Sequence, residues 1–376
     1  MFDLRNFLNP TLKTWLKASI LALLLFTLSL NFSPPSQAAK RQSSMPAGNA
    51  ITDAEALLRY ALPIDNDAVR EIQSSLEDIG NHIRAKRWGP ISRDVRKASR
   101  VISDPDDILD DIAAEQKPQA ETLISDLNTG IAELEKAVEE KNRDLVNELK
   151  GKLLKKVGAI EELMVKEFPF EIPSEYANLP QLKGRATVQL ETEKGLVTFI
   201  VDGYSAPITA GNFVDLVQRG FYNGLKFIRS EESYVLQAGD PDPKGPEDGF
   251  IDPATGKYRS IPLEVLVRGD QEPTYGITLE DAGRYRDRPV LPFSAYGAVA
   301  MARVESEPDS ASSQFFFFLF EPELTPAGLN LLDGRYAVFG YTIEGKEVLE
   351  KLKQGDTIIS AKVIEGAENL VQPQSA

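Results

Sequence analysis

The chain has 376 residues, more than a single hydrophobic core usually serves, so we expect two domains. Its 57 Asp and Glu residues outnumber its 42 Lys and Arg residues, for a formal net charge of -15, and this balance argues against nucleic acid as a partner. Cysteine is absent and His82 is the only histidine, which excludes disulfides, a thiolate nucleophile, a histidine-based triad and a multi-histidine metal site.

Residues 1–38 have the features of a secretory leader. Basic residues precede an apolar run at residues 20–30, and the small residues Ser36 and Ala38 follow it at the positions that a signal peptidase recognises. The run is shorter than the roughly 20 residues that a membrane span requires. We therefore predict a Sec-type signal peptide and an exported protein, with an uncleaved anchor as the alternative. Residues 39–50 follow as a flexible lead-in.

Apolar residues recur at helical spacing over residues 51–168, which predicts a helical bundle. The first helix breaks at Pro63, and the spacing resumes at Val69 after Asp65 or Asn66 as the cap. A later seam alternates steps of three and four residues: Ile124, Leu127, Ile131, Leu134 and Val138. This seam is either the interior of an antiparallel bundle, which we favour because no strict heptad is sustained, or a partner-binding zipper.

Prolines end the helical region in a linker at residues 169–184, and beyond it the apolar period changes to two. A hairpin with its turn at Lys194 and Gly195 comes first, followed by an amphipathic helix in APITAGNFVDLVQRGFY. Short strands separated by Gly, Pro and Asp turns fill the rest of residues 185–376. Many short strands with few helices predict a barrel or a sandwich.

The stretch SSQFFFFLF places a glutamine directly beside consecutive phenylalanines. Because side chains alternate along a strand, Gln314, Phe316 and Phe318 share one face, and Phe315 and Phe317 share the other. One interpretation is a strand buried on both faces, with Gln314 bound to a backbone group.

Four segments, read in chain order, resemble a cyclophilin, a peptidyl-prolyl cis-trans isomerase with an eight-stranded closed β-barrel. They are FIRSEESYVLQAGD, GAVAMAR, DSASSQFF and LLDGRYAVFG. Together with EALLRYALPIDNDAVREIQSSLEDI they look like the thylakoid-lumen cyclophilins of plants and cyanobacteria, which carry a helical bundle before the barrel. The resemblance implies a multidomain α and β protein, with an N-terminal helical bundle and a C-terminal cyclophilin-like eight-stranded β-barrel over residues 185–376.

The resemblance also implies the site residues. Arg229 corresponds to the catalytic arginine, and Gln237 and Gln314 correspond to the amides of the substrate groove. Tyr234 stands where the family usually has the phenylalanine of the proline pocket. The remaining groove residues that the resemblance implies are Val235, Ala302, Arg303, Phe316, Leu331, Leu332 and Tyr336.

Several of these positions depart from the family pattern. Many cyclophilins have tryptophan at Leu331, histidine at Tyr336, methionine at Val235 and asparagine at Arg303. A reshaped pocket costs about 2–4 kcal/mol of transition-state binding, which is about 30-fold to 1000-fold in rate. The resemblance implies no metal and no other cofactor. The long segment between Asp240 and the GAVAMAR strand shows no EF-hand spacing and indicates ordered loops.

Our first hypothesis is a peptidyl-prolyl isomerase that acts on X-Pro bonds of proteins in the thylakoid lumen or periplasm. Resemblance to the lumenal branch implies photosystem II subunits as clients, assistance to photosystem II assembly, and peripheral contact with membrane complexes. The alternative is a weakly active or inactive cyclophilin that binds proline segments as a chaperone or assembly factor. In a third hypothesis the bundle folds over the groove and regulates it. The sequence leaves the oligomeric state open.

Overall fold

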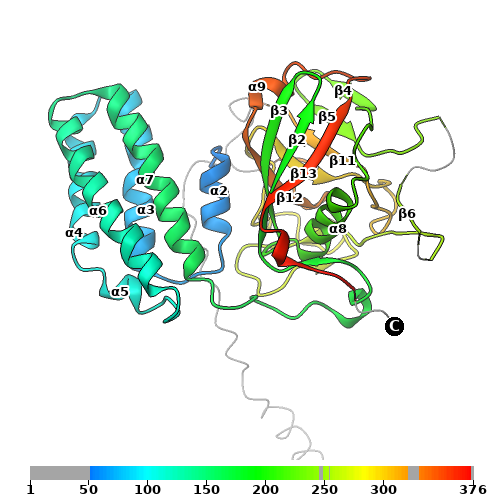
Figure 1. Ribbon diagram of the computed structural model, residues 1–376, viewed down its shortest axis with the longest axis horizontal. Helices are drawn as coiled ribbons and strands as arrows, with labels where there is room; N and C mark the ends of the chain where they lie inside the picture. Colours follow the sequence, from blue (N-terminus) through cyan, green and yellow to red (C-terminus); the bar gives the residue numbers. More distant parts are fainter. Residues whose placement is uncertain (1–50, 245–248, 254, 321–329, 374–376) are drawn as a thin grey trace, which may run out of the picture. The chain divides into compact units, whose positions relative to one another are not determined.

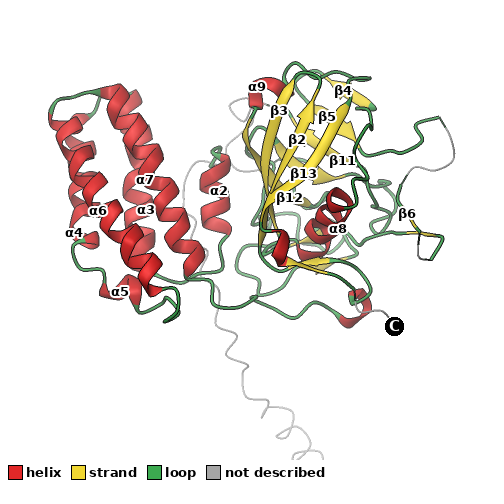
Figure 2. Cartoon of the chain, in the orientation of Figure 1, coloured by secondary structure: helices red, strands yellow, loops and turns green. Residues whose placement is uncertain are grey.

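The computed structural model describes residues 51–244, 249–253, 255–320 and 330–373. Helices come first along this part of the chain and strands follow, as Figures 1 and 2 show. The predicted signal peptide and lead-in lie outside the described residues. None of the helices in the described ranges is both long and apolar enough to cross a membrane.

The helical region is built on a buried apolar cluster that its helices share. The helices are α3 (Asp67–Arg84), α4 (Trp88–Ile102), α5 (Asp106–Leu109), α6 (Lys117–Glu139) and α7 (Arg143–Leu163). As predicted, Asn66 caps α3, because its side-chain oxygen accepts a hydrogen bond from the backbone N–H of Val69 at 2.9 Å. The predicted seam of α6 is buried in the shared cluster, which identifies it as the interior of the bundle.

Helix α2 (Ala54–Ala61) differs from the prediction that residues 51–168 form one bundle. Its apolar side chains, including Leu57 and Leu58, belong to a cluster on the sheet that also contains Phe316 and Tyr341. Apolar spacing shows which side of a helix is buried, but it does not show which element covers that side.

The C-terminal region is an antiparallel sheet of eight strands. In spatial order they are β13 (Ile358–Glu365), β2 (Arg185–Thr192), β3 (Gly195–Asp202), β12 (Val338–Glu344), β10 (Ala298–Met301), β11 (Phe315–Phe318), β5 (Val235–Ala238) and β4 (Arg229–Glu231). Residues just before β4 bond to residues around the start of β13: Phe227 N–H donates to Asp356 O at 2.9 Å, and Ile358 N–H donates to Leu225 O at 2.8 Å. The sheet therefore curls until its two edges meet, as the predicted barrel requires.

Short elements complete this region. They are α8 (Pro207–Gln218), α9 (Lys346–Leu349), two 3₁₀ turns (Ser174–Tyr176 and Ala367–Asn369), and the strand pairs β1 (Gln181–Leu182) with β14 (Leu370–Val371), β6 (Ile251–Asp252) with β7 (Lys257–Tyr258), and β8 (Glu264–Val265) with β9 (Thr274–Tyr275). Strand β8 is tied to the start of α8, where Glu264 accepts hydrogen bonds from the backbone N–H groups of Ile208 and Thr209 at 3.1 and 2.9 Å. A buried carboxylate thus satisfies N–H groups that a helix leaves free in its first turn.

The β2–β3 hairpin turns one residue earlier than we predicted. Thr192 pairs with Gly195, so the turn residues are Glu193 and Lys194. The Thr192 hydroxyl donates to the Gly195 carbonyl at 2.7 Å and accepts from the Lys194 N–H at 3.2 Å. These side-chain bonds close the two-residue loop and leave Gly195 within the strand pair.

The phenylalanine run of β11 divides between two clusters, as strand alternation predicts. Phe315 and Phe317 are fully buried in the interior of the curled sheet, beside residues of α8. Phe316 and Phe318 point to the opposite face and belong to the cluster that α2 shares. This opposite face carries the predicted groove.

Candidate active site

Two cross-strand rows place four of the predicted site residues on one face of the sheet: Arg229, Val235, Gln237 and Phe316. In the first row Arg229 of β4 pairs with Gln237 of β5, which pairs with Phe316 of β11. In the second row Glu231 pairs with Val235, which pairs with Phe318. Residues paired across antiparallel strands point to the same face, so a cation, an amide and an aromatic ring are neighbours.

The two groove amides are joined to each other. Gln237 Nε2 donates to Gln314 Oε1 at 2.8 Å. The backbone carbonyl of Gln314 also accepts the N–H of Ala302 at 2.9 Å, which connects this residue to the end of the β10 strand. These bonds fix the position of both amides relative to the strand pairs on either side.

Apolar and aromatic side chains pack into a cluster beside the amides. Val235 and Phe316 are each 5% exposed, and Leu332 packs against the same cluster. The Tyr336 ring meets the Phe316 ring edge to face, with centroids 5.6 Å apart. Tyr234 is 36% exposed and lies edge to face with Phe318, a member of this cluster, at 5.9 Å.

Arg303 lies beside this cluster and lines a small cavity. Its guanidinium lies over the Tyr336 ring, 5.1 Å from the centroid, and its Nε donates to the backbone carbonyl of Arg335 at 2.9 Å. Burial lowers the pKa of Arg303, yet an arginine remains charged. This cavity has a volume of about 150 Å³ and is lined by Gln237, Tyr258, Ala302, Arg303, Val304, Ser310, Ser312 and Gln314.

Leu331 is a predicted groove residue that the structure does not pack into this cluster. It is 90% exposed, whereas the neighbouring Leu332 is partly buried. Its place in the groove stays a prediction. Arg229 lies at the edge of the groove with half of its side chain exposed.

Sequence reasoning missed two residues of this face. Phe293 is 2% exposed and stacks on Phe316, with centroids 6.0 Å and planes 4° apart. It comes from the segment that we assigned to loops, and a phenylalanine just before a strand offers no signal of its contact. Glu231 was also missed, although its position two residues after Arg229 on one strand predicts the same face.

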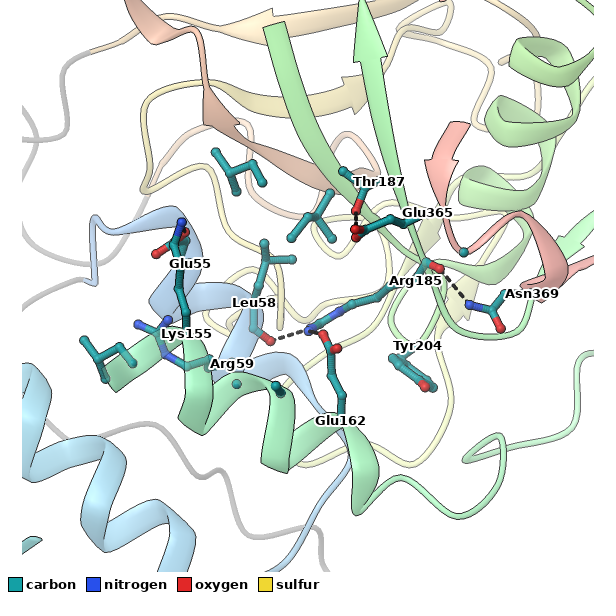
Figure 3. A pocket seen from close by; sticks show the side chains of 16 residues that line it. Glu55, Leu58, Arg59, Lys155, Glu162, Arg185, Thr187, Tyr204, Glu365 and Asn369 are labelled. Atoms are coloured by element: carbon teal, nitrogen blue, oxygen red, sulfur yellow. Dashed lines mark hydrogen bonds and ion pairs between the residues drawn. The ribbon is translucent and has the colours of Figure 1, made fainter. Parts of the chain in front are cut away.

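A larger cavity, of about 480 Å³, lies away from all of the predicted site residues. Figure 3 shows that Arg185 of β2 points into it and donates hydrogen bonds to the carbonyl of Leu58 and to Glu162 Oε1. Arg185 also bonds to the buried Asp202 at 3.1 Å. The guanidinium of Arg185 is therefore paired with acceptors of the protein itself, and none of the predicted site residues lines this cavity.

The residues of the groove suit chemistry that moves no proton. Within the described residues, no group of Asp, Glu and His side chains is arranged to hold a metal ion. The groove offers a cation that is paired with a carboxylate, two amides and an apolar wall. Such a set binds a peptide, excludes water around it and donates hydrogen bonds to it.

Comparison with known proteins identifies both parts of the chain. Residues 53–165 match the family described as "CYP38-like, PsbQ-like domain", and residues 187–368 match cyclophilin-type peptidyl-prolyl cis-trans isomerases. A relative from Synechocystis sp., whose name assigns it to the peptidyl-prolyl cis-trans isomerases of the thylakoid lumen, is 57% identical over 96% of this chain and 96% of its own length.

Two chloroplastic relatives from Arabidopsis thaliana extend the match. The peptidyl-prolyl cis-trans isomerase CYP38 is 47% identical over 88% of this chain and 78% of its own length. The isomerase CYP37 is 36% identical over 85% of this chain and 71% of its own length. The chain thus belongs to the cyclophilin-type peptidyl-prolyl cis-trans isomerases, in the branch that carries a CYP38-like, PsbQ-like domain before the cyclophilin domain.

Proposed function

We propose that this protein isomerises X-Pro peptide bonds of lumenal proteins with Arg229 as its catalytic residue. One observation carries the proposal: Arg229, Gln237 and Phe316 occupy one cross-strand row, so the cation, the amide and the pocket ring face one peptide together. The match to cyclophilin-type isomerases over residues 187–368 supports the same reaction.

The reaction requires only that the prolyl nitrogen lose part of its amide resonance. That resonance holds the bond behind a barrier of about 18–20 kcal/mol, so an X-Pro bond rotates in roughly tens of seconds unaided. In our mechanism the pyrrolidine ring packs against the apolar cluster that contains Val235, Phe316 and Tyr336. Gln237 then binds the neighbouring carbonyl, and Arg229 donates a hydrogen bond to the prolyl nitrogen.

A hydrogen bond at this nitrogen localises its lone pair and weakens the double-bond character of the C–N bond. The aromatic wall strengthens the bond by excluding water from it, because the interaction is stronger at low local dielectric. No nucleophile, metal or general base takes part. The side chains that we assign to the mechanism keep their protonation states throughout.

We further propose that the clients are photosystem II subunits in the thylakoid lumen. The relatives from Synechocystis sp. and Arabidopsis thaliana are named as lumenal or chloroplastic proteins, which supports the lumen over the periplasm. The predicted leader at residues 1–38 is consistent with export. Resemblance to the lumenal branch is what suggests photosystem II, in its assembly or its repair.

The test is an isomerase assay of the chain from Ala39 onward, by protease coupling or by NMR exchange, with Arg229→Ala. We expect the variant to lose about 100-fold to 1000-fold in kcat/KM, as is typical when a preorganised donor to a transition state is removed. Arg335→Ala is the matched control, because Arg335 is likewise a partly exposed arginine that pairs with a carboxylate, that of Glu280, and we assign it no part in the reaction. Equal rates for the two variants would contradict the role of Arg229.

The second candidate function is a proline-binding chaperone with little or no isomerase activity. Its specific support is Leu331, which is 90% exposed and leaves one side of the pocket without the tryptophan that many cyclophilins have there. In this case the unmodified protein would isomerise a peptide at the uncatalysed rate and still bind it. Titration of a proline peptide, followed by NMR, separates this outcome from an empty groove.

A further inference from the structure

Arg229 forms an ion pair with Glu231, a residue that has no part in the proposed reaction. Its Nε donates to Glu231 Oε1 at 2.7 Å, and its Nη2 lies 2.5 Å from the same oxygen. Both nitrogens on one edge of the guanidinium therefore face one carboxylate oxygen. The two residues occupy the ends of β4, the edge strand of the sheet.

The register of the strands puts this carboxylate inside the groove region. Glu231 pairs with Val235, and Val235 pairs with Phe318, so Glu231 points to the same face as the proline pocket. Meanwhile Gln237, the cross-strand partner of Arg229, donates its own amide to Gln314. The Arg229 guanidinium is therefore paired with the Glu231 carboxylate of its own strand, whereas the Gln237 amide of the neighbouring strand binds Gln314.

We propose that Glu231 is a positioning residue that restrains Arg229 and that a client must displace. This inference rests on the proposed catalytic role of Arg229. The carboxylate holds the guanidinium at the groove edge and offsets its positive charge, so the field that Arg229 exerts on a prolyl nitrogen is weakened. A client with a lysine or arginine beside its proline competes for Glu231 and releases Arg229.

The exposure of the pair sets the size of the effect. The two side chains are 50% and 49% exposed, so water and salt weaken their attraction. An exposed ion pair typically favours the paired form over the separated charges by about two- to fivefold. Glu231 is therefore a restraint that a peptide can overcome, and its removal should raise kcat/KM by about two- to fivefold.

The experiment compares Glu231→Gln with the unmodified protein in the same isomerase assay. Glu232→Gln is the matched control, because it removes an equal charge from the next residue, an exposed carboxylate in the turn after β4. Glu231→Asp is the conservative variant and should keep the restraint. The double variant Glu231→Gln with Arg229→Ala tests whether any gain acts through the arginine.

A salt series and a peptide pair give readouts that a merely structural role would not change. Added salt should raise the rate of the unmodified protein towards that of Glu231→Gln and leave the variant unchanged, because screening weakens only the paired form. Peptides with lysine beside the Ala-Pro bond should react faster than those with glutamate. Glu231→Gln should lose this preference.

The outcomes separate this inference from the proposed function. The restraint is supported if Glu231→Gln raises kcat/KM, Glu232→Gln does not, and the rise disappears when Arg229→Ala is added. This holds even if the unmodified protein is nearly inactive. No gain, or an equal gain in both variants, overturns the restraint and leaves Arg229 to its own test. If Arg229→Ala alone has no effect, the proposed catalytic role fails, and a gain that persists in the double variant shows that Glu231 acts elsewhere.

Discussion

Replacing Phe293 by leucine should weaken both the fold and the proline pocket. The Phe293 ring is 2% exposed, stacks on Phe316 at 6.0 Å and meets Phe318 edge to face at 5.1 Å. An aromatic pair contributes about 0.5–1.5 kcal/mol beyond the area that it buries, so losing two pairs costs about 1–3 kcal/mol in the free energy of unfolding. Leucine keeps the site apolar and limits the cavity that forms.

The functional consequence follows from the position of the ring behind Phe316. Without its stacked neighbour Phe316 loses part of its support, and we expect proline peptides to bind about 1 kcal/mol more weakly, which is about a fivefold rise in KM. The value of kcat should change less, because Phe293 does not approach the rotating bond. Urea unfolding and the isomerase assay measure the two effects on the same samples.

Phe199→Leu is the matched control for this prediction. Phe199 is also fully buried and meets two rings, Phe213 at 5.8 Å and Phe317 at 5.7 Å, but it lies in the interior of the curled sheet. Both variants should lose similar stability, and only Phe293→Leu should raise KM. Equal KM values in the two variants would show that the stack on Phe316 has no part in peptide binding.

Three further predictions concern stability and affinity. Burial, outweighing two backbone N–H donors, raises the pKa of Glu264 to about 7, so the folded state binds this proton more tightly than the unfolded state does. The free energy of unfolding should therefore gain about 3 kcal/mol from this group as the pH falls from 8 to 4, and Glu264→Gln should remove that gain in urea titrations at several pH values. Arg185→Met leaves the buried Asp202 unpaired and should cost about 3–5 kcal/mol by urea unfolding, whereas a loss below about 1 kcal/mol would contradict the pairing. Leu331→Trp restores a groove aromatic and should tighten proline-peptide binding by about 0.5–1.5 kcal/mol in a fluorescence titration.

The sequence predicts the face of each strand better than it predicts the neighbours of each side chain. Alternation along SSQFFFFLF separates Phe316 from Phe315 correctly, because the period of a strand is two whatever it packs against. The Asn66 cap is likewise a local feature and is predicted within one residue. Local geometry is therefore available from local sequence.

Contacts between distant segments are what sequence patterns leave out. Helix α2 has the spacing of a bundle helix, but its apolar side packs on the sheet cluster that contains Tyr341. Phe293 reaches the pocket from a long connecting segment, where no periodicity exists to assign a face. The pairing of Arg229 with Glu231 is a local feature, since residues two apart on a strand share a face. The family resemblance assigns a role to Arg229 but none to Glu231.

The distribution of titratable groups separates stability from catalysis in this protein. Burial is the chief cause that raises the pKa of two carboxyl groups to about 7: Glu161 in the bundle and Glu264 on β8. Both lie outside the groove. The groove side chains that we assign to the reaction are an arginine, two amides and apolar or phenolic rings, and none of them is a buried carboxylate. Acidification should therefore stabilise the fold through groups that the reaction does not use. An enzyme that weakens an amide bond by donating a hydrogen bond, and not by moving a proton, can tolerate such changes in pH.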